Sequence, residues 1–107
     1  MRGKLKLTSL ELKVKEILDS LGVKYIAQYP TRTGFIIDFA IIIGENKIAI
    51  EVDGEKWHST KRQKKRDRFK DYQLKREGWK IIRIKEKDIS SEYIKEKLEN
   101  MSIVKLE

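Results

Sequence analysis

Two neighbouring apolar segments, joined by a short Gly-Glu-Asn link, constrain the fold of this chain more than any other feature. Residues 35–43 and 47–52 are rich in β-branched side chains, which favour extended structure. The shortness of the link predicts that the two segments pair as an antiparallel hairpin. A further extended segment at 23–29, ended by Pro30, and another at 79–84 bring the predicted number of strands to four.

Helical signals precede, interrupt and follow these strands. Thr8 and Glu11 have the spacing of an N-terminal capping box, and apolar residues recur behind them at intervals of three and four until Gly22. Asp88 opens a last amphipathic segment. The predicted order is helix-strand-strand-strand-helix-strand-helix. We therefore expect an α/β (α+β) fold with a mixed four-stranded sheet, in which the third and fourth strands run parallel through a crossover.

The helix of that crossover is predicted to run from Ser59 or Thr60 to Glu77. Its first two turns are almost wholly polar, and its apolar side chains come later. We therefore expect its C-terminal half to be anchored to the sheet and its N-terminal half to project outward. The predicted anchors are Phe69, Tyr72 and Leu74.

Positive charge is concentrated in the same segment. The 107 residues include 25 Lys and Arg against 17 Asp and Glu, a net charge of +8, and residues 55–80 hold eleven basic and four acidic residues of these. Such clustering favours a polyanionic partner, although a solvated helix that maintains solubility would also explain it. The candidate nucleic-acid contacts are Arg32, Lys56, Lys61, Arg62, Lys64, Lys65, Arg66 and Arg68.

The composition narrows the class of protein further. The chain has no cysteine, which excludes disulfide scaffolds, thiolate metal sites and cysteine nucleophiles, and which fits a reducing compartment. We therefore expect a cytoplasmic, intracellular protein. The longest apolar stretch, residues 35–43, is interrupted by Asp38, so no membrane span is expected. The length is that of one domain, predicted to cover residues 1–107.

Three acidic residues stand out because they interrupt the two apolar segments of the predicted hairpin. Asp38 lies in the first segment, and Glu51 and Asp53 point to the same side of the second by strand alternation. Clustered buried carboxylates are unfavourable unless a cation compensates them, and an all-oxygen set favours Mg²⁺ or Mn²⁺. The alternative for Asp38 is a surface-facing position or an ion pair with Arg83.

Three further polar residues that follow these acids in the sequence are candidates for the same site. His58, the only histidine, suits proton transfer or contact with a metal-coordinated water, and a packing or surface role is the alternative. Asp67 is the one acid in the most basic stretch, where it would orient His58 or an attacking water, or simply relieve repulsion between its neighbours. Lys56 would stabilise charge on a phosphorane, or be a flexible surface lysine.

A longer set of residues, in this order and at these spacings, is shared with a known group of enzymes. The set is Asp38-Phe39, Ile50-Glu51-Val52-Asp53-Gly54, His58, Asp67, Leu74, Gly78-Trp79 and Ile82-Arg83. It resembles the very-short-patch-repair (Vsr)-like endonucleases and related small domains of the PD-(D/E)XK, or restriction-endonuclease-like, superfamily. The resemblance covers roughly residues 8–89, and the predicted order of elements is the core of that fold.

The resemblance implies a set of metal ligands. Asp38 would be the central ligand of a divalent cation. Glu51 and the carbonyl group of Val52 would complete the protein's share of the shell. Glu11 would match the acid that many members carry on the first helix.

The resemblance also implies the remaining catalytic groups and the activity. His58 and Asp67 would match the His and Asp of related homing enzymes whose pattern is Glu, Asp, His, Asp. Where the superfamily motif has Lys, this chain has Asp53, so water activation would fall to His58 or a second metal. The histidines and cysteines that bind zinc in mismatch-nicking members are missing, so specificity for T·G mismatches is not expected.

The predicted function is therefore a Mg²⁺- or Mn²⁺-dependent endonuclease that acts on DNA as a monomer or homodimer. A catalytically inactive nucleic-acid-binding module of the same fold and a junction-resolving or mobile-element nuclease are the alternatives.

Overall fold

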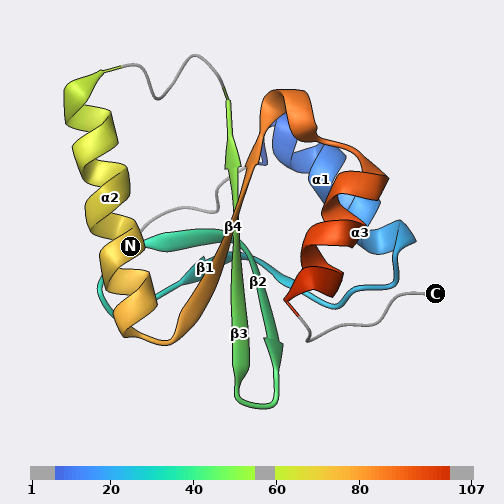
Figure 1. Ribbon diagram of the computed structural model, residues 1–107, viewed down its shortest axis with the longest axis horizontal. Helices are drawn as coiled ribbons and strands as arrows, with labels where there is room; N and C mark the ends of the chain where they lie inside the picture. The colour runs from blue at the N-terminus through green and yellow to red at the C-terminus, as the bar shows by residue number, and fades with distance from the viewer. Residues whose placement is uncertain (1–6, 55–59, 102–107) are drawn as a thin grey trace.

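The computed structural model describes residues 7–54 and 60–101 and confirms the predicted fold class (Figure 1). One four-stranded mixed sheet lies between helices on its two faces. The elements are α1 (Ser9–Ser20), β1 (Ile26–Pro30), β2 (Ile36–Ile43), β3 (Asn46–Asp53), α2 (Lys61–Arg76), β4 (Trp79–Lys85), the short 3₁₀-helix η2 (Glu86–Asp88) and α3 (Ser91–Asn100).

The strands lie in the order β1-β2-β3-β4, with β1, β2 and β3 antiparallel and β4 parallel to β3. The predicted hairpin is confirmed, because Ile43 pairs with Asn46 across a two-residue turn. Gly44 occupies that turn with a φ of 60°, a left-handed conformation that glycine adopts without strain. The predicted parallel pairing is also confirmed, since Ile50 pairs with both Phe39 of β2 and Ile82 of β4.

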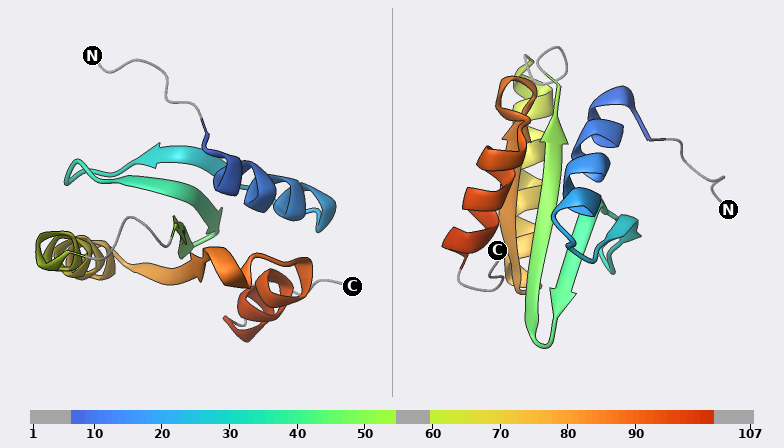
Figure 2. Two further views of the ribbon diagram at one scale, coloured as in Figure 1. Left: turned by 90° about the horizontal axis from the view of Figure 1, so that it is seen from above. Right: turned by 90° about the vertical axis from the view of Figure 1, so that its right-hand side faces the viewer.

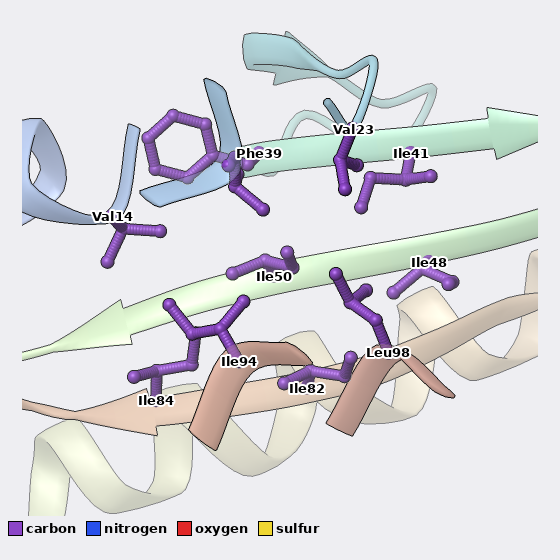
Figure 3. Packing of buried hydrophobic residues seen from close by; sticks show 11 residues of the cluster. Val14, Val23, Phe39, Ile41, Ile48, Ile50, Ile82, Ile84, Ile94 and Leu98 are labelled. Carbon is purple, nitrogen blue, oxygen red and sulfur yellow. The ribbon is translucent and has the colours of Figure 1, made fainter. Parts of the chain in front are cut away.

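Each face of the sheet carries its own apolar cluster. On the face covered by α1 and α3, Phe39 and Ile50 pack with Val14 and Leu98 in the larger cluster (Figure 3). Helix α2 covers the opposite face (Figure 2). There its Leu74 packs with a smaller set of sheet residues. The two sets separate because successive strand side chains point to opposite faces. The smaller cluster comprises Ile37, Ala40, Ala49, Leu74 and Trp79.

The N-terminal ends of α1 and α2 follow the predicted capping. Thr8 Oγ1 accepts a hydrogen bond from the Glu11 backbone N–H (3.2 Å), and the Thr8 N–H donates to Glu11 Oε1 (2.8 Å), so the capping box is complete. Thr60 caps α2 and Ser90 caps α3, and each side chain accepts the backbone N–H of the residue three positions further on. The hydrogen bonds of the capping box therefore hold the Glu11 side chain at the first turn of α1.

Three predictions about local structure differ from the outcome. The last helix begins after its cap Ser90, whereas Asp88, which was predicted to open it, lies in η2. The first strand begins at Ile26 rather than at residue 23. Of the three predicted anchors of α2, only Leu74 is buried, whereas Phe69 and Tyr72 are 56% and 57% exposed. The reason is helical geometry: at about 100° per residue, Phe69 and Tyr72 lie far around the helix from Leu74, which faces the sheet.

No helix in residues 7–54 and 60–101 is both long enough and apolar enough to cross a membrane.

Candidate active site where strands β2 and β3 separate

The candidate site lies where β2 and β3 stop pairing with each other. Their ladder runs from Ile43–Asn46 to Phe39–Ile50, and Asp38 and Glu51 are the next residues on the two strands. Beyond this point the Val52 backbone N–H donates to Asp38 Oδ2 at 2.8 Å. The carboxylate of Asp38 thus accepts from a strand N–H next to the end of the ladder, at the level of Glu51.

The strands are distorted at the same level. Ile37 belongs to the apolar cluster beneath α2, whereas Phe39 belongs to the cluster on the other face, so the regular alternation breaks at Asp38. The register of β1 with β2 sets Gln28 opposite Asp38, and Gln28 has a φ of 56°, in the left-handed region. Few non-glycine residues adopt that conformation, and such positions are frequent at functional sites.

Glu51 is a buried acid with one paired and one unpaired oxygen. Its side chain lies on the α2 face of β3, and the residue is 4% exposed. Lys70 Nζ of α2 donates to Glu51 Oε1 at 2.5 Å and to the carbonyl oxygen of Ile36 at 2.9 Å. Glu51 Oε2 is buried and has no hydrogen-bond partner within the described part of the chain. An orphaned buried carboxylate oxygen is unfavourable unless a ligand or ion completes it.

Burial and mutual repulsion perturb both carboxyl groups. Burial, followed by the negative charge of Glu51, raises the pKa of Asp38 from its usual 3.8 to about 8, against the opposing hydrogen bond from Val52. Glu11 contributes in the same direction, so the first turn of α1 adds negative potential at Asp38. Burial also raises the pKa of Glu51, and the ammonium group of Lys70 opposes that rise. If both groups are ionised, the site therefore carries more negative charge than its protein neighbours compensate.

This arrangement predicts an unusual pH dependence of stability in metal-free buffer. Between about pH 4 and pH 8, Asp38 holds a proton in the folded protein that the unfolded chain has lost, so the free energy of unfolding falls as the pH rises. The loss is on the order of a few kcal/mol above pH 8. Urea unfolding in chelator at about pH 5.5 and at about pH 8.5 measures it, and Asp38→Asn should show a clearly smaller decrease than the parent. Equal decreases would contradict the raised pKa.

The environment of Asp53 differs from that of Asp38 and Glu51. Both of its carboxylate oxygens lie 3.2 Å from Arg83 Nη1 of β4, and Arg83 Nη2 donates to Asp71 of α2. Arg83 therefore pairs with Asp53 and Asp71. The alternative ion pair between Arg83 and Asp38 is not the one that the structure shows. The structure brings Asp38 and Glu51 together, and it places Asp53 in an ion-pair network beside them.

The remaining predicted site residues are distributed around this pair. Val52 contacts Asp38 through its backbone N–H. Asp67 is partly buried on α2, three residues before Lys70 and seven before Leu74, so it lies on the sheet-facing side of the helix. His58 and Lys56 lie outside the described residues. In residues 7–54 and 60–101, no group of three or more acidic or histidine side chains has the arrangement of a metal site. The metal-binding candidates that the structure brings together are thus the pair Asp38 and Glu51, with Glu11 close enough to interact with the carboxyl group of Asp38.

The predicted nucleic-acid contacts that the structure describes lie in two places, along α2 and in the loop that carries Arg32. Arg66 is exposed on α2. Arg32 instead lines a cavity of about 320 Å³ with Tyr29, Lys47 and Trp79. Its loop contacts the C-terminal end of α2, because Thr33 Oγ1 donates to Glu77 Oε2 at 2.9 Å. A hollow of about 520 Å³ follows the N-terminal half of the helix and is lined by Lys61, Arg62, Lys64, Lys65 and Arg68.

Lys70 is a site residue that sequence patterns alone did not single out. It sits among exposed lysines and arginines, so composition does not distinguish it from them. The signal that could have found it is its position four residues before Leu74, which assigns it to the face of α2 that packs on the sheet. A lysine on a buried helical face needs an acidic or carbonyl partner.

Two comparisons place this fold in the class of restriction-endonuclease-like nucleases. Residues 10–104 match the model of the restriction-endonuclease family REase_MTES_1575, so the chain belongs to that family. Among solved structures, the "Homing Endonuclease I-Bth0305I Catalytic Domain" is similar, with a TM-score of 0.63 and 26% sequence identity over 90% of this chain and 92% of the other. No curated protein sequence matches the chain significantly.

Proposed function

We propose that this protein is a divalent-metal-dependent endonuclease that hydrolyses phosphodiester bonds in DNA. Membership of a restriction-endonuclease family supports the reaction class. The observation that carries the proposal is the buried pair of Asp38 and Glu51, with Glu51 Oε2 unpartnered among the described residues, beside a helix rich in Lys and Arg. Such a site combines carboxylates that would be stabilised by a bound cation with a neighbouring surface that can bind a polyanion.

The residues present fit Mg²⁺ or Mn²⁺. Both ions prefer oxygen ligands, and Asp38 and Glu51 provide carboxylates at a point where their charge is under-compensated. The carbonyl group of Val52 and the carboxylate of Glu11 are the further proposed donors. When bound, the metal supplies Lewis-acid polarisation of the scissile phosphate and of water.

The protein's own groups have distinct proposed roles around that centre. Lys70 keeps the carboxylate of Glu51 oriented through its contacts with Oε1 and the Ile36 carbonyl. Asp53 would act on the site indirectly, because its ion pair with Arg83 ties the end of β3 to β4. His58 and Asp67 are proposed to accept and relay the proton of the attacking water. Lys56 would meet charge that develops on the phosphoryl group.

The sugar-phosphate backbone would be bound mainly along α2. Exposed cations of this kind neutralise phosphates and orient the duplex without reading its sequence. Because the proposed centre is a single acid pair, cutting both strands would require a homodimer or two successive nicks. We propose that residues 1–107 act as a single nuclease domain in either case.

Two finer relationships are proposed. The spacing of Asp38, Glu51-Val52 and His58 supports a Vsr-like nuclease, with a role in DNA processing such as repair. The similarity to the catalytic domain of a homing endonuclease favours, as a second candidate, a mobile-element nuclease built on the same site.

The proposal is tested by incubating the protein with supercoiled, mismatched, branched and flapped DNA in the presence of Mg²⁺, Mn²⁺ or chelator. We expect cleavage of at least one substrate with either metal and none with chelator. Calorimetric titration with Mg²⁺ or Mn²⁺ then separates an enzyme from an inactive module. Binding of DNA without cleavage and without metal binding would contradict the proposed activity and favour the inactive module.

The basic surface of α2 predicts that DNA binding depends on salt concentration. Replacing Lys61 and Lys64 with Ala should weaken binding to a duplex whatever its sequence, because each neutralises a phosphate. The slope of log K against log salt concentration should decrease by about 0.9 for each phosphate that is no longer neutralised. Fluorescence anisotropy over a salt series measures it. Replacing Lys15 of α1 and the exposed Lys24 that follows this helix serves as the charge-matched control. An equal decrease in slope there would argue against a localised site.

A further inference from the structure

The outward face of α2 carries two exposed aromatic rings between cations. Arg62, Lys65, Phe69, Tyr72 and Arg76 recur at alternating intervals of three and four residues, so they form one line along the helix, which we call the α2 stripe. All five are exposed. The guanidinium group of Arg76 lies 5.8 Å from the centroid of the Tyr72 ring. Exposed Phe and Tyr at adjacent positions on a basic helix indicate a binding surface.

The stripe adjoins the candidate active site. Phe69 packs edge-on against Phe35, with ring centroids 5.9 Å apart. Each ring is the sequence neighbour of a residue at the site: Phe69 precedes Lys70, and Phe35 precedes Ile36, whose carbonyl accepts from Lys70. The aromatic part of the stripe therefore begins beside the Lys70–Glu51 ion pair.

The charges of the stripe limit what can cover it. A second copy of α2 packed on the stripe in either direction would set arginines and lysines against one another, and like charges at such positions are destabilising. A partner for the stripe must compensate its cations and cover its aromatic rings. A nucleic acid does both, because phosphates compensate the cations and bases can stack on the rings. In an intact duplex the faces of the bases are covered by their neighbours and only their edges are accessible in the grooves. Stacking on Phe69 and Tyr72 requires bases that are unstacked.

We infer that the α2 stripe binds unpaired bases, so that the substrate is a nucleic acid with a single-stranded or unstacked stretch next to the scissile phosphate. The inference rests on the proposed nuclease function and specifies its substrate class. Arg62, Lys65 and Arg76 hold the phosphates, and Phe69 and Tyr72 stack on the bases. A DNA flap, gap or mismatch would meet this requirement, whereas a continuous duplex would use only the cations.

The test compares a labelled single-stranded DNA, a blunt duplex of the same sequence and a duplex with a single-stranded flap, by fluorescence anisotropy in chelator. Removing both rings (Phe69→Ala with Tyr72→Ala) should weaken single-strand and flap binding roughly 5-fold or more per ring, or about 1 kcal/mol each, and duplex binding by less than about 2-fold. Phe69→Tyr and Tyr72→Phe should retain affinity, whereas Leu at both positions should not. Leu12→Ala, which truncates an exposed apolar residue of α1, is the matched control.

The outcomes separate this inference from the proposed function. Equal losses on all three probes, no loss, or full affinity in the double Leu variant would overturn the inference. So would a concentration-dependent dimer, seen by sedimentation, that removal of the rings abolishes. If the parent cleaves duplex DNA with Mg²⁺ and the rings do not matter, the endonuclease stands and this inference fails. If the rings matter for single-strand binding but nothing is cleaved, the inference stands and the endonuclease fails.

Discussion

Asp38→Asn should abolish metal-dependent cleavage, with a decrease on the order of 100-fold or more, while DNA binding stays intact or becomes tighter. Asparagine has nearly the same shape and keeps an oxygen that can accept the hydrogen bond from the Val52 N–H. It lacks the negative charge that would attract a divalent cation. Above about pH 8, where Asp38 is ionised without metal, removing that charge also lowers repulsion towards the phosphates. Cleavage of the best DNA substrate in Mg²⁺ and binding in chelator are the two measurements.

The control for this substitution removes one negative charge from an exposed position of the same molecule. Asp19 lies at the end of α1 and pairs with Lys15, remote from the Asp38–Glu51 pair in the chain. Asp19→Asn should leave cleavage within about 2-fold of the parent, because exposed pairs contribute little. Cleavage by Asp38→Asn at the rate of the parent would rule out the proposed site. Equal loss in both variants would point to a general charge effect.

Lys70→Met should reduce the stability of the protein by about 3–5 kcal/mol at pH 8 in chelator. Methionine retains much of the apolar length of lysine but leaves the buried Glu51 carboxylate and the Ile36 carbonyl without their shared donor. An uncompensated buried charge is the main source of the expected loss. Urea unfolding monitored by circular dichroism measures the change.

A double-mutant cycle shows whether the loss comes from this ion pair. Glu51→Gln removes the charge that Lys70 compensates, so the double variant should recover much of the stability lost in Lys70→Met alone. Lys75→Met, on the exposed side of α2, is the matched control and should change stability by less than about 0.5 kcal/mol. Additive effects of Lys70→Met and Glu51→Gln would mean that the contact between them does not stabilise the fold.

Short-range patterns along the chain were sufficient to predict much of the fold. The capping box of Thr8 and Glu11 involves residues three apart. The hairpin depends on a turn at Gly44, and the register that this turn sets places Asp38 and Glu51 at the same level of adjacent strands. These features depend on backbone propensity and strand periodicity, which neighbouring residues specify.

The compensation of charge at the site depends on contacts that no local pattern specifies. Lys70 meets Glu51 across 19 residues of sequence, and Arg83 meets Asp53 across 30. Both contacts are set by how α2 and β4 pack on β3. The exposure of Phe69 and Tyr72 has the same origin, because the rotation of α2 about its axis decides which side chains reach the sheet. Amino-acid pattern thus specified the strands and their acids, whereas packing of distant elements selected which acids are neutralised and which remain available to a cation.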